Sequence, residues 1–107
     1  MRLADRECVP CRGGVPPLSE DRIAQLLAEL NHGWEIEGGH LCKTYRFANF
    51  RDALACTNRI GELAESVQHH PDIWLAWGRV RIEVWTHKIN GLTETDFVFC
   101  AKCDERV

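Results

Sequence analysis

The stretch ESVQHHPDIW, residues 65–74, places two adjacent histidines immediately before a proline. A residue that precedes proline avoids the helical region of backbone space, so a helix entering this stretch must stop before Pro71. Neighbouring residues on a helix point about 100° apart, so His69 and His70 could not share one site while the helix continued. Where the helix ends, both rings can turn into one cleft. The stretch therefore predicts a helix-to-strand junction that carries two imidazoles.

Helical periodicity predicts a long helix upstream of this junction. Asn49 is a suitable N-cap, and Asp52 adds negative charge in the first turn, where the helix dipole favours it. The predicted apolar stripe comprises Phe50, Ala53, Leu54, Thr57, Ile60, Ala64 and Val67. This stripe spans the segment, so the helix is expected to reach the histidine pair.

Two strands are expected downstream of the junction, at residues 74–77 and 79–87, with Gly78 near the turn. In the second strand apolar residues at 80, 82 and 84 alternate with residues 81, 83 and 85, which is typical of a half-buried strand. The same alternation places His87 with Glu83 and Trp85, on the face opposite the valines.

The N-terminal half of the chain predicts a helix followed by a hairpin. Ser19 is a natural N-cap, and the helix presents the apolar stripe Ile23, Leu26, Leu27 and Leu30 before residues 31–33 end it. Strands are expected at 34–37 and 41–47, joined by Gly38-Gly39; their mixed pattern leaves open which face is buried. Residues 1–17 contain several Gly and Pro and are expected to be irregular.

The last helix is expected to run from Thr93 to about Glu105, because Thr93 and Asp96 fit a capping box. The element order is then α-β-β-α-β-β-α within a single domain, residues 1–107. Neighbouring strands joined as hairpins, with helices between them, favour an α+β fold: a four-stranded antiparallel sheet with helices on one face.

Composition excludes several functional classes. Of the 107 residues 45% are hydrophobic and 27% charged, and the net charge of −3 carries no basic excess for nucleic-acid binding. No apolar run approaches the roughly 20 residues that cross a bilayer. The N-terminal MRLADRECVPC shows no apolar core of a signal peptide, so a cytoplasmic location is expected.

His69, His70 and His87 are the candidate catalytic residues, since imidazole exchanges protons near neutral pH. Two other interpretations remain at this point. The pair could be exposed charges at a helix end, which the helix dipole favours. Three imidazoles could also hold zinc, although two directly adjacent ligands are geometrically awkward.

Two Cys-x-x-Cys pairs raise a second metal hypothesis, a four-thiolate zinc site formed by Cys8, Cys11, Cys100 and Cys103. The pairs lie far apart in sequence, and the second falls within a predicted helix, where its sulfurs would not converge. Packing as small apolar side chains is the favoured role of Cys100 and Cys103.

The motif residues together resemble the pterin-4a-carbinolamine dehydratase family, in its bacterial form. The resemblance covers nearly the whole chain, including Trp34 at the first strand and CVPCRGGVPPLS at residues 8–19. Trp77 stands where many members have Tyr. The residues that carry the match are Glu65, His69-His70-Pro71, Trp77, Thr86-His87, Gly91-Leu92 and Asp96.

The resemblance implies dehydration of 4a-hydroxytetrahydrobiopterin to quinonoid dihydrobiopterin, which recycles the pterin of phenylalanine hydroxylase, with no metal or cofactor. His69 and His87 would exchange protons with the substrate, and His70 would hold the hydroxyl. Glu65, four residues before His69, would orient that ring. Trp34 would wall the pocket or belong to the core. Thr86 and Asp96 also belong to the pattern, but for Asp96 the capping role is favoured.

The resemblance also implies a homodimer or homotetramer, with the pterin substrate and a hydroxylase as partners. An alternative is a non-catalytic dehydratase-like binding or assembly factor, as in the branch linked to RuBisCO assembly in carboxysomes. The intact three-histidine motif favours the enzyme.

Overall fold

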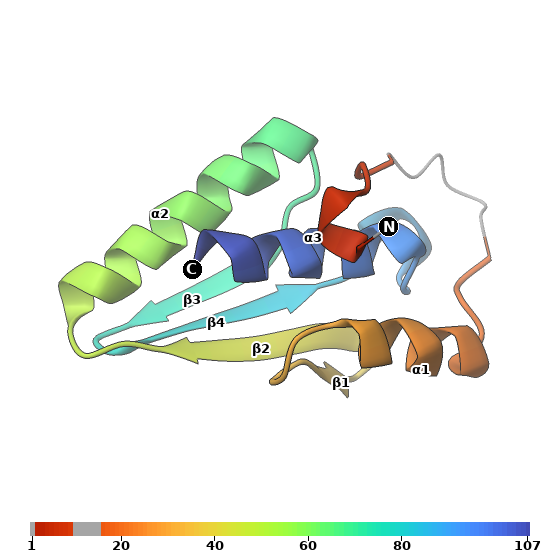
Figure 1. Cartoon of the computed structure of the whole chain (residues 1–107), viewed down its shortest axis with the longest axis horizontal. Coiled ribbons are helices and arrows are strands. Elements are labelled where there is room, and N and C mark those ends of the chain that lie inside the picture. The colour runs from red at the N-terminus through yellow and green to blue at the C-terminus, as the bar shows by residue number, and fades with distance from the viewer. Residues whose placement is uncertain (1, 10–15) are drawn as a thin grey trace.

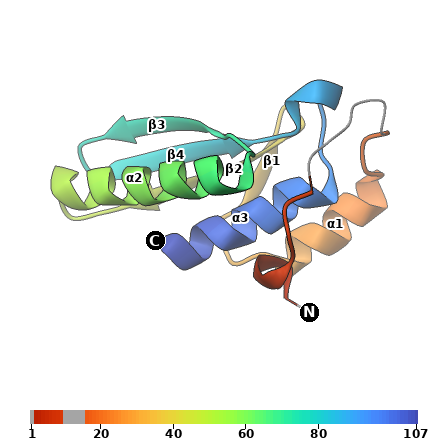
Figure 2. The ribbon, with the colours of Figure 1, turned by 90° about the horizontal axis from the view of Figure 1, so that it is seen from above.

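The computed structural model describes residues 2–9 and 16–107. Four antiparallel strands, β1 (Glu35–Glu37), β2 (His40–Arg46), β3 (Asp72–Ala76) and β4 (Arg79–Val84), form one sheet in the order β1-β2-β4-β3. The helices α1 (Glu20–Glu29), α2 (Phe50–Val67) and α3 (Glu94–Arg106) cover one face of this sheet (Figure 1, Figure 2). The predicted α+β fold and element order are confirmed.

The register of the two central strands decides which face is buried. Val80 and Val84 of β4 pair with Tyr45 and Leu41 of β2, and all four side chains lie in the core beneath the helices. The first hairpin, whose sequence pattern was ambiguous, therefore buries the face of Leu41 and Tyr45. Its turn is formed by Gly38 and Gly39, both with positive φ, which glycine adopts without steric cost.

Helix α2 begins as predicted, since the side chain of Asn49 accepts a hydrogen bond from the Asp52 amide at 2.8 Å. Its predicted apolar stripe is wrong in part, because Phe50 and Leu54 are 44% and 39% exposed. The residues of α2 that are buried instead recur every three or four positions: Ala53, Cys56, Ile60, Leu63 and Ala64. Phe50 and Leu54 lie beside this face and point away from the sheet.

Strand β4 ends three residues earlier than predicted. A tight loop follows it, because the Thr86 amide donates to the Gly91 carbonyl at 2.9 Å and Asn90 takes a left-handed conformation. His87 consequently begins a short 3-10 helix, η2 (His87–Ile89), instead of ending a strand. The loop places His87 beyond the end of the sheet.

The described residues 2–9 of the N-terminal segment are more ordered than their composition predicts. Residues Leu3–Asp5 form a 3-10 helix, η1, and Leu3 is buried in the core. The Lys102 ammonium of α3 donates to the Ala4 carbonyl at 2.8 Å. Cys11 lies outside the described residues. In the part of the chain that the structure describes, no helix combines the length and apolar character needed to cross a membrane.

Candidate active site

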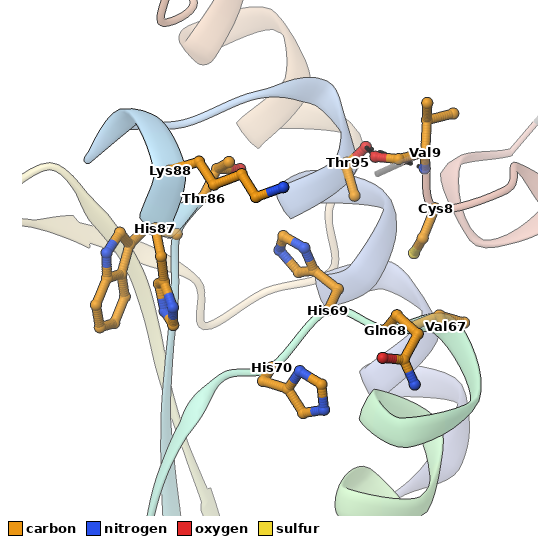
Figure 3. A pocket seen from close by; sticks show the side chains of 11 residues that line it. Cys8, Val9, Val67, Gln68, His69, His70, Thr86, His87, Lys88 and Thr95 are labelled. Carbon is orange, nitrogen blue, oxygen red and sulfur yellow. Dashed lines mark hydrogen bonds between the residues drawn. The ribbon is translucent and has the colours of Figure 1, made fainter. Parts of the chain in front are cut away.

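A pocket of about 180 Å³ lies where the break after α2, the loop after β4, the start of α3 and the N-terminal segment meet (Figure 3). All three candidate histidines line it. Its lining consists of Cys8, Val9, Val67, Gln68, His69, His70, Trp85, Thr86, His87, Lys88 and Thr95.

The backbone at the end of α2 separates the two adjacent histidines. Gln68 follows the last helical residue in a left-handed conformation, with φ of 55° and ψ of 42°. The amides of Gln68 and His69 both donate to the Ala64 carbonyl, which closes the helix end. This turn directs the His69 ring toward α3, and His70 lies farther along the chain before β3 begins.

His69 is anchored on a buried carboxylate. Its Nε2 lies 2.7 Å from Oδ1 of Asp96, and its ring packs against Phe99 with the ring centroids 5.5 Å apart. The His69 side chain is 14% exposed and that of Asp96 is fully buried. An ionised carboxylate only accepts hydrogen bonds, so Nε2 carries the proton and Nδ1 remains the nitrogen that can accept one.

Asp96 serves the helix and the histidine at once. Its Oδ2 accepts hydrogen bonds from the Thr86 hydroxyl at 2.7 Å and from the Thr93 amide at 2.8 Å, completing the predicted capping box of α3. Its Oδ1 is thereby left to His69. Sequence reasoning favoured the capping role alone, whereas the structure shows that capping orients the carboxylate that holds His69.

Glu65 contacts His70 and not His69. Nε2 of His70 lies 2.5 Å from Oε2 of Glu65, and the two side chains are 50% and 75% exposed. The expected contact between Glu65 and His69 is therefore wrong. The four-residue spacing brings side chains together only on a continuous helix, and α2 ends at Val67.

His87 approaches the pocket from the loop after β4. Its ring lies against Trp85 with centroids 4.4 Å apart, so the predicted association of these two residues is confirmed although the strand ends before them. Trp85 is stacked in turn on His40, whose Nδ1 lies 2.6 Å from Oε1 of Glu83. An aromatic stack thus supports His87 from the outer face of the sheet.

Trp34 lies apart from the pocket. It is 6% exposed, and its Nε1 donates to Asp104 at 2.9 Å while its ring meets Tyr45 edge-on. Of the two roles open for Trp34, the structure shows the core position. Thr86, in contrast, is buried at the pocket wall and connects to Asp96.

Three of the four cysteines of the two pairs, Cys8, Cys100 and Cys103, lie within the described residues. Cys100 and Cys103 are buried within α3, where burial raises the pKa of both thiols. Cys8 lines the pocket, and Cys11 belongs to the residues left undescribed. Within residues 2–9 and 16–107, no three His, Cys, Asp or Glu side chains are grouped so that they could hold a metal ion.

Sequence reasoning missed several pocket residues. Gln68, Trp85 and Lys88 adjoin the candidate histidines in sequence, which is a usable signal. No sequence signal indicated that Cys8, Val9 and Thr95 would reach the same pocket, because that depends on how the N-terminal segment packs on α3.

Comparisons with known proteins identify the family of this chain. Residues 16–106 match the family model described as pterin 4 alpha carbinolamine dehydratase. A protein of Rubrobacter xylanophilus whose name places it in the same family is 57% identical over 103 residues, which are 95% of each chain.

Two solved structures extend the comparison. A transcriptional coactivator/pterin dehydratase from Brucella melitensis matches with a TM-score of 0.78 at 27% identity, over 84% of this chain and 97% of its own. A pterin dehydratase-like protein identified as a RuBisCO assembly factor in the alpha-carboxysome matches with a TM-score of 0.62 at 24% identity, over 70% of this chain and 89% of its own. The second likeness concerns the fold alone.

Proposed function

Because the chain belongs to the pterin-4a-carbinolamine dehydratase family, we propose that it dehydrates 4a-hydroxytetrahydrobiopterin to quinonoid dihydrobiopterin. The observation that carries the proposal is the His69–Asp96 hydrogen bond at a pocket that His70 and His87 also line. A histidine fixed on a buried carboxylate, with two further imidazoles beside it, is suited to proton transfer near neutral pH.

The reaction requires two proton transfers and no change of oxidation state. The bond between C4a and its hydroxyl oxygen breaks, and the hydroxyl takes up a proton and leaves as water. A ring nitrogen loses a proton, and its electron pair completes the new double bond. Positioned side chains can supply both transfers, each of which contributes to the rate by general acid–base catalysis.

We assign the role of base to His69, because Asp96 fixes its tautomer and leaves Nδ1 as the acceptor. His87 is the proposed acid for the departing hydroxyl. Its ring is supported by Trp85 but stays exposed, so it can exchange protons with solvent between turnovers. His70, paired with Glu65, is proposed to hold the hydroxyl in place.

Stopped-flow dehydration of the carbinolamine tests this proposal. His69→Ala and His87→Ala are expected to lower kcat by about 10²- to 10⁴-fold each, the usual contribution of a positioned acid or base. His32→Ala is the matched control, since His32 is exposed and does not line the pocket, and its kcat should equal that of the wild type. Unchanged kcat in both pocket variants would refute the assignment.

We further propose that the protein recycles the pterin of an aromatic amino acid hydroxylase such as phenylalanine hydroxylase, in the cytoplasm, as a homodimer or homotetramer. Exposed Phe50 and Leu54 on α2 support self-association, because an apolar helix face of this kind gains stability when a second copy covers it. Sedimentation of the wild type and of Leu54→Asp tests this: the variant should dissociate, and a monomeric wild type would contradict the proposal.

A further inference from the structure

The pocket has one wall that the proposed chemistry does not use. Cys8 and Val9, here called the N-terminal wall, line the same pocket as the three histidines. In Figure 3 Cys8 and Val9 lie on one side of the His69 ring, with the Val9 side chain turned outward, and His87 and Lys88 lie on the other side. The N-terminal wall therefore borders the pocket that holds His69, and Val9 lies at its rim.

The N-terminal wall is attached to α3 at both ends of its segment. Near the start, Leu3 is buried and Lys102 donates to the Ala4 carbonyl. At the wall itself, the Thr95 hydroxyl donates to the Val9 carbonyl at 3.0 Å and accepts from the Val9 amide at 3.3 Å. Two hydrogen bonds from one side chain fix the backbone of Val9 against the first turn of α3.

The chemistry of the wall excludes a part in proton transfer. Val9 carries no titratable group, and burial raises the pKa of the Cys8 thiol, which keeps that thiol neutral. The Val9 side chain is nevertheless 64% exposed, an apolar surface at the rim of a pocket whose other members are mostly polar. Such a surface can contact a ligand and displace water, but it cannot act on the reacting atoms.

The wall also lies outside the part of the chain that matches the family model, which begins at residue 16. The histidines, Thr86 and Asp96 all lie within that part. Residues that border the pocket without carrying its proton-transfer groups are suited to selecting among substrates that undergo the same reaction.

We propose that the N-terminal wall determines substrate specificity, an inference that rests on the proposed function. In this proposal Val9 and Cys8 contact the substituent on the reduced ring of the pterin. Thr95 is the positioning residue that holds them there. Natural pterins share the reacting atoms and differ in this substituent. An apolar wall favours a small apolar substituent over one that carries hydroxyl or charged groups. Contact with the wall would remove water from those polar groups without replacing the hydrogen bonds that the water made.

The test compares kcat/KM for two carbinolamines, one with a methyl and one with a dihydroxypropyl substituent. Val9→Asp is expected to shift the ratio of the two kcat/KM values about tenfold toward the dihydroxypropyl compound, since the carboxylate can accept hydrogen bonds from its hydroxyls. The change should appear chiefly in the ratio of the two kcat/KM values, because the histidines are untouched. Val9→Asn provides the same comparison without charge.

Matched controls separate specificity from stability. Val107→Asp makes the same change at another exposed valine, about 18 Å along α3 from Thr95, and should leave the ratio unchanged. Thr95→Val removes the hydroxyl that holds Val9 and should alter the ratio of the two kcat/KM values. Thr95→Ser keeps a hydroxyl and should leave this ratio as in the wild type. A ratio within twofold of the wild type in both Val9 variants, or equal ratios in the two Thr95 variants, would overturn the inference.

Failure of the proposed function gives a different result. If the wild type dehydrates neither carbinolamine, the proposed dehydratase function is rejected. The role of the N-terminal wall is then tested by ligand binding alone. Stable dihydropterins with the same two substituents serve as probes, with dissociation constants from fluorescence quenching. The Val9 variants should shift the ratio of dissociation constants in the same direction; unchanged ratios would reject the wall as a determinant of specificity.

Discussion

Nε2 of His69 and Oδ1 of Asp96 lie 2.7 Å apart, and the carboxylate has no access to solvent. The same carboxylate accepts hydrogen bonds from Thr86 and from the Thr93 amide. The start of a helix and the orientation of a candidate catalytic ring therefore depend on one side chain. Because His69 contacts Oδ1 whereas Thr86 and Thr93 contact Oδ2, mutations of the separate partners can distinguish the two roles.

Asp96→Asn is expected to lower kcat by about 10²-fold or more, because an amide no longer fixes the His69 tautomer or stabilises its protonated form. Thr93→Val removes only the capping hydroxyl and should cost about 1 kcal/mol of unfolding free energy with little change in kcat. Stopped-flow rates and urea denaturation measure the two effects. Equal loss of kcat in both variants would show that Asp96 matters for the helix alone.

Glu65→Gln is expected to have a small effect. The Glu65–His70 pair is 75% and 50% exposed, and exposed ion pairs contribute about 0–1 kcal/mol. Unfolding free energy should stay within about 1 kcal/mol of the wild type, and kcat should fall far less than in Asp96→Asn. A loss as large as that of Asp96→Asn would indicate that His70, and not His69, is the principal proton-transfer residue.

Asp104→Ala should destabilise the fold without affecting catalysis. The Asp104 carboxylate accepts hydrogen bonds from Trp34 at 2.9 Å, Lys43 at 2.8 Å and Tyr45 at 2.6 Å, and is 4% exposed. Its removal leaves the Lys43 ammonium unpaired in a nearly buried site, at a cost of about 3 kcal/mol in urea denaturation.

The neighbouring Glu105 provides the control for Asp104. It pairs with Arg2, and the two side chains are 47% and 70% exposed, so Glu105→Ala should change the unfolding free energy by less than about 1 kcal/mol. Both variants should retain the wild-type kcat. A drop in kcat for Asp104→Ala at temperatures where it is folded would place Trp34 and its neighbours in the catalytic machinery.

Stability is expected to fall in alkaline solution. Burial, reinforced by the Glu83 carboxylate, raises the pKa of Cys42 from 9.0 to about 11. Burial also raises the pKa of Cys100 and Cys103. Between pH 9 and about pH 11 the unfolded chain releases the Cys42 thiol proton, whereas the folded chain keeps it. The contribution of this thiol to the unfolding free energy is therefore fully present below pH 9 and is lost as the pH rises towards 11. The slope is about 1.4 kcal/mol per pH unit for each such thiol.

Urea denaturation at pH 8 and pH 10.5, with a reductant present, measures this slope. The midpoint should be lower at the higher pH, and Cys42→Ala should reduce the difference. A midpoint that is equal or higher at pH 10.5 would contradict the assignment of buried, protonated thiols.

Local sequence signals predicted most of the fold because they act over short distances. Asn49, Ser19 and the Thr93–Asp96 pair mark helix starts by their own hydrogen bonds, and Pro71 excludes the helix beyond His70. The alternation in residues 80–85 fixed which side of β4 is buried. These signals left it open whether the three histidines would converge, and the resemblance to the dehydratase family led to that prediction.

What the sequence did not predict depends on distant contacts or on a single backbone angle. Phe50 and Leu54 fit an apolar stripe, but the sheet selects which side of α2 it covers. Glu65 contacts His70 in place of His69 because Gln68 adopts a left-handed conformation. A glutamine in the sequence does not predict that conformation. Val9 lies at the pocket where Thr95, 86 residues later in the chain, binds its backbone.

The left-handed turn at Gln68 also gives the side chains of the adjacent residues His69 and His70 two different timescales of motion. His69 is held on a buried acceptor, where rotation of its ring requires the loss of a shielded hydrogen bond. His70 is tied only to a surface carboxylate, and exposed side chains change rotamer within nanoseconds. Consecutive residues thus supply one stationary imidazole and one fast-moving imidazole to the same pocket.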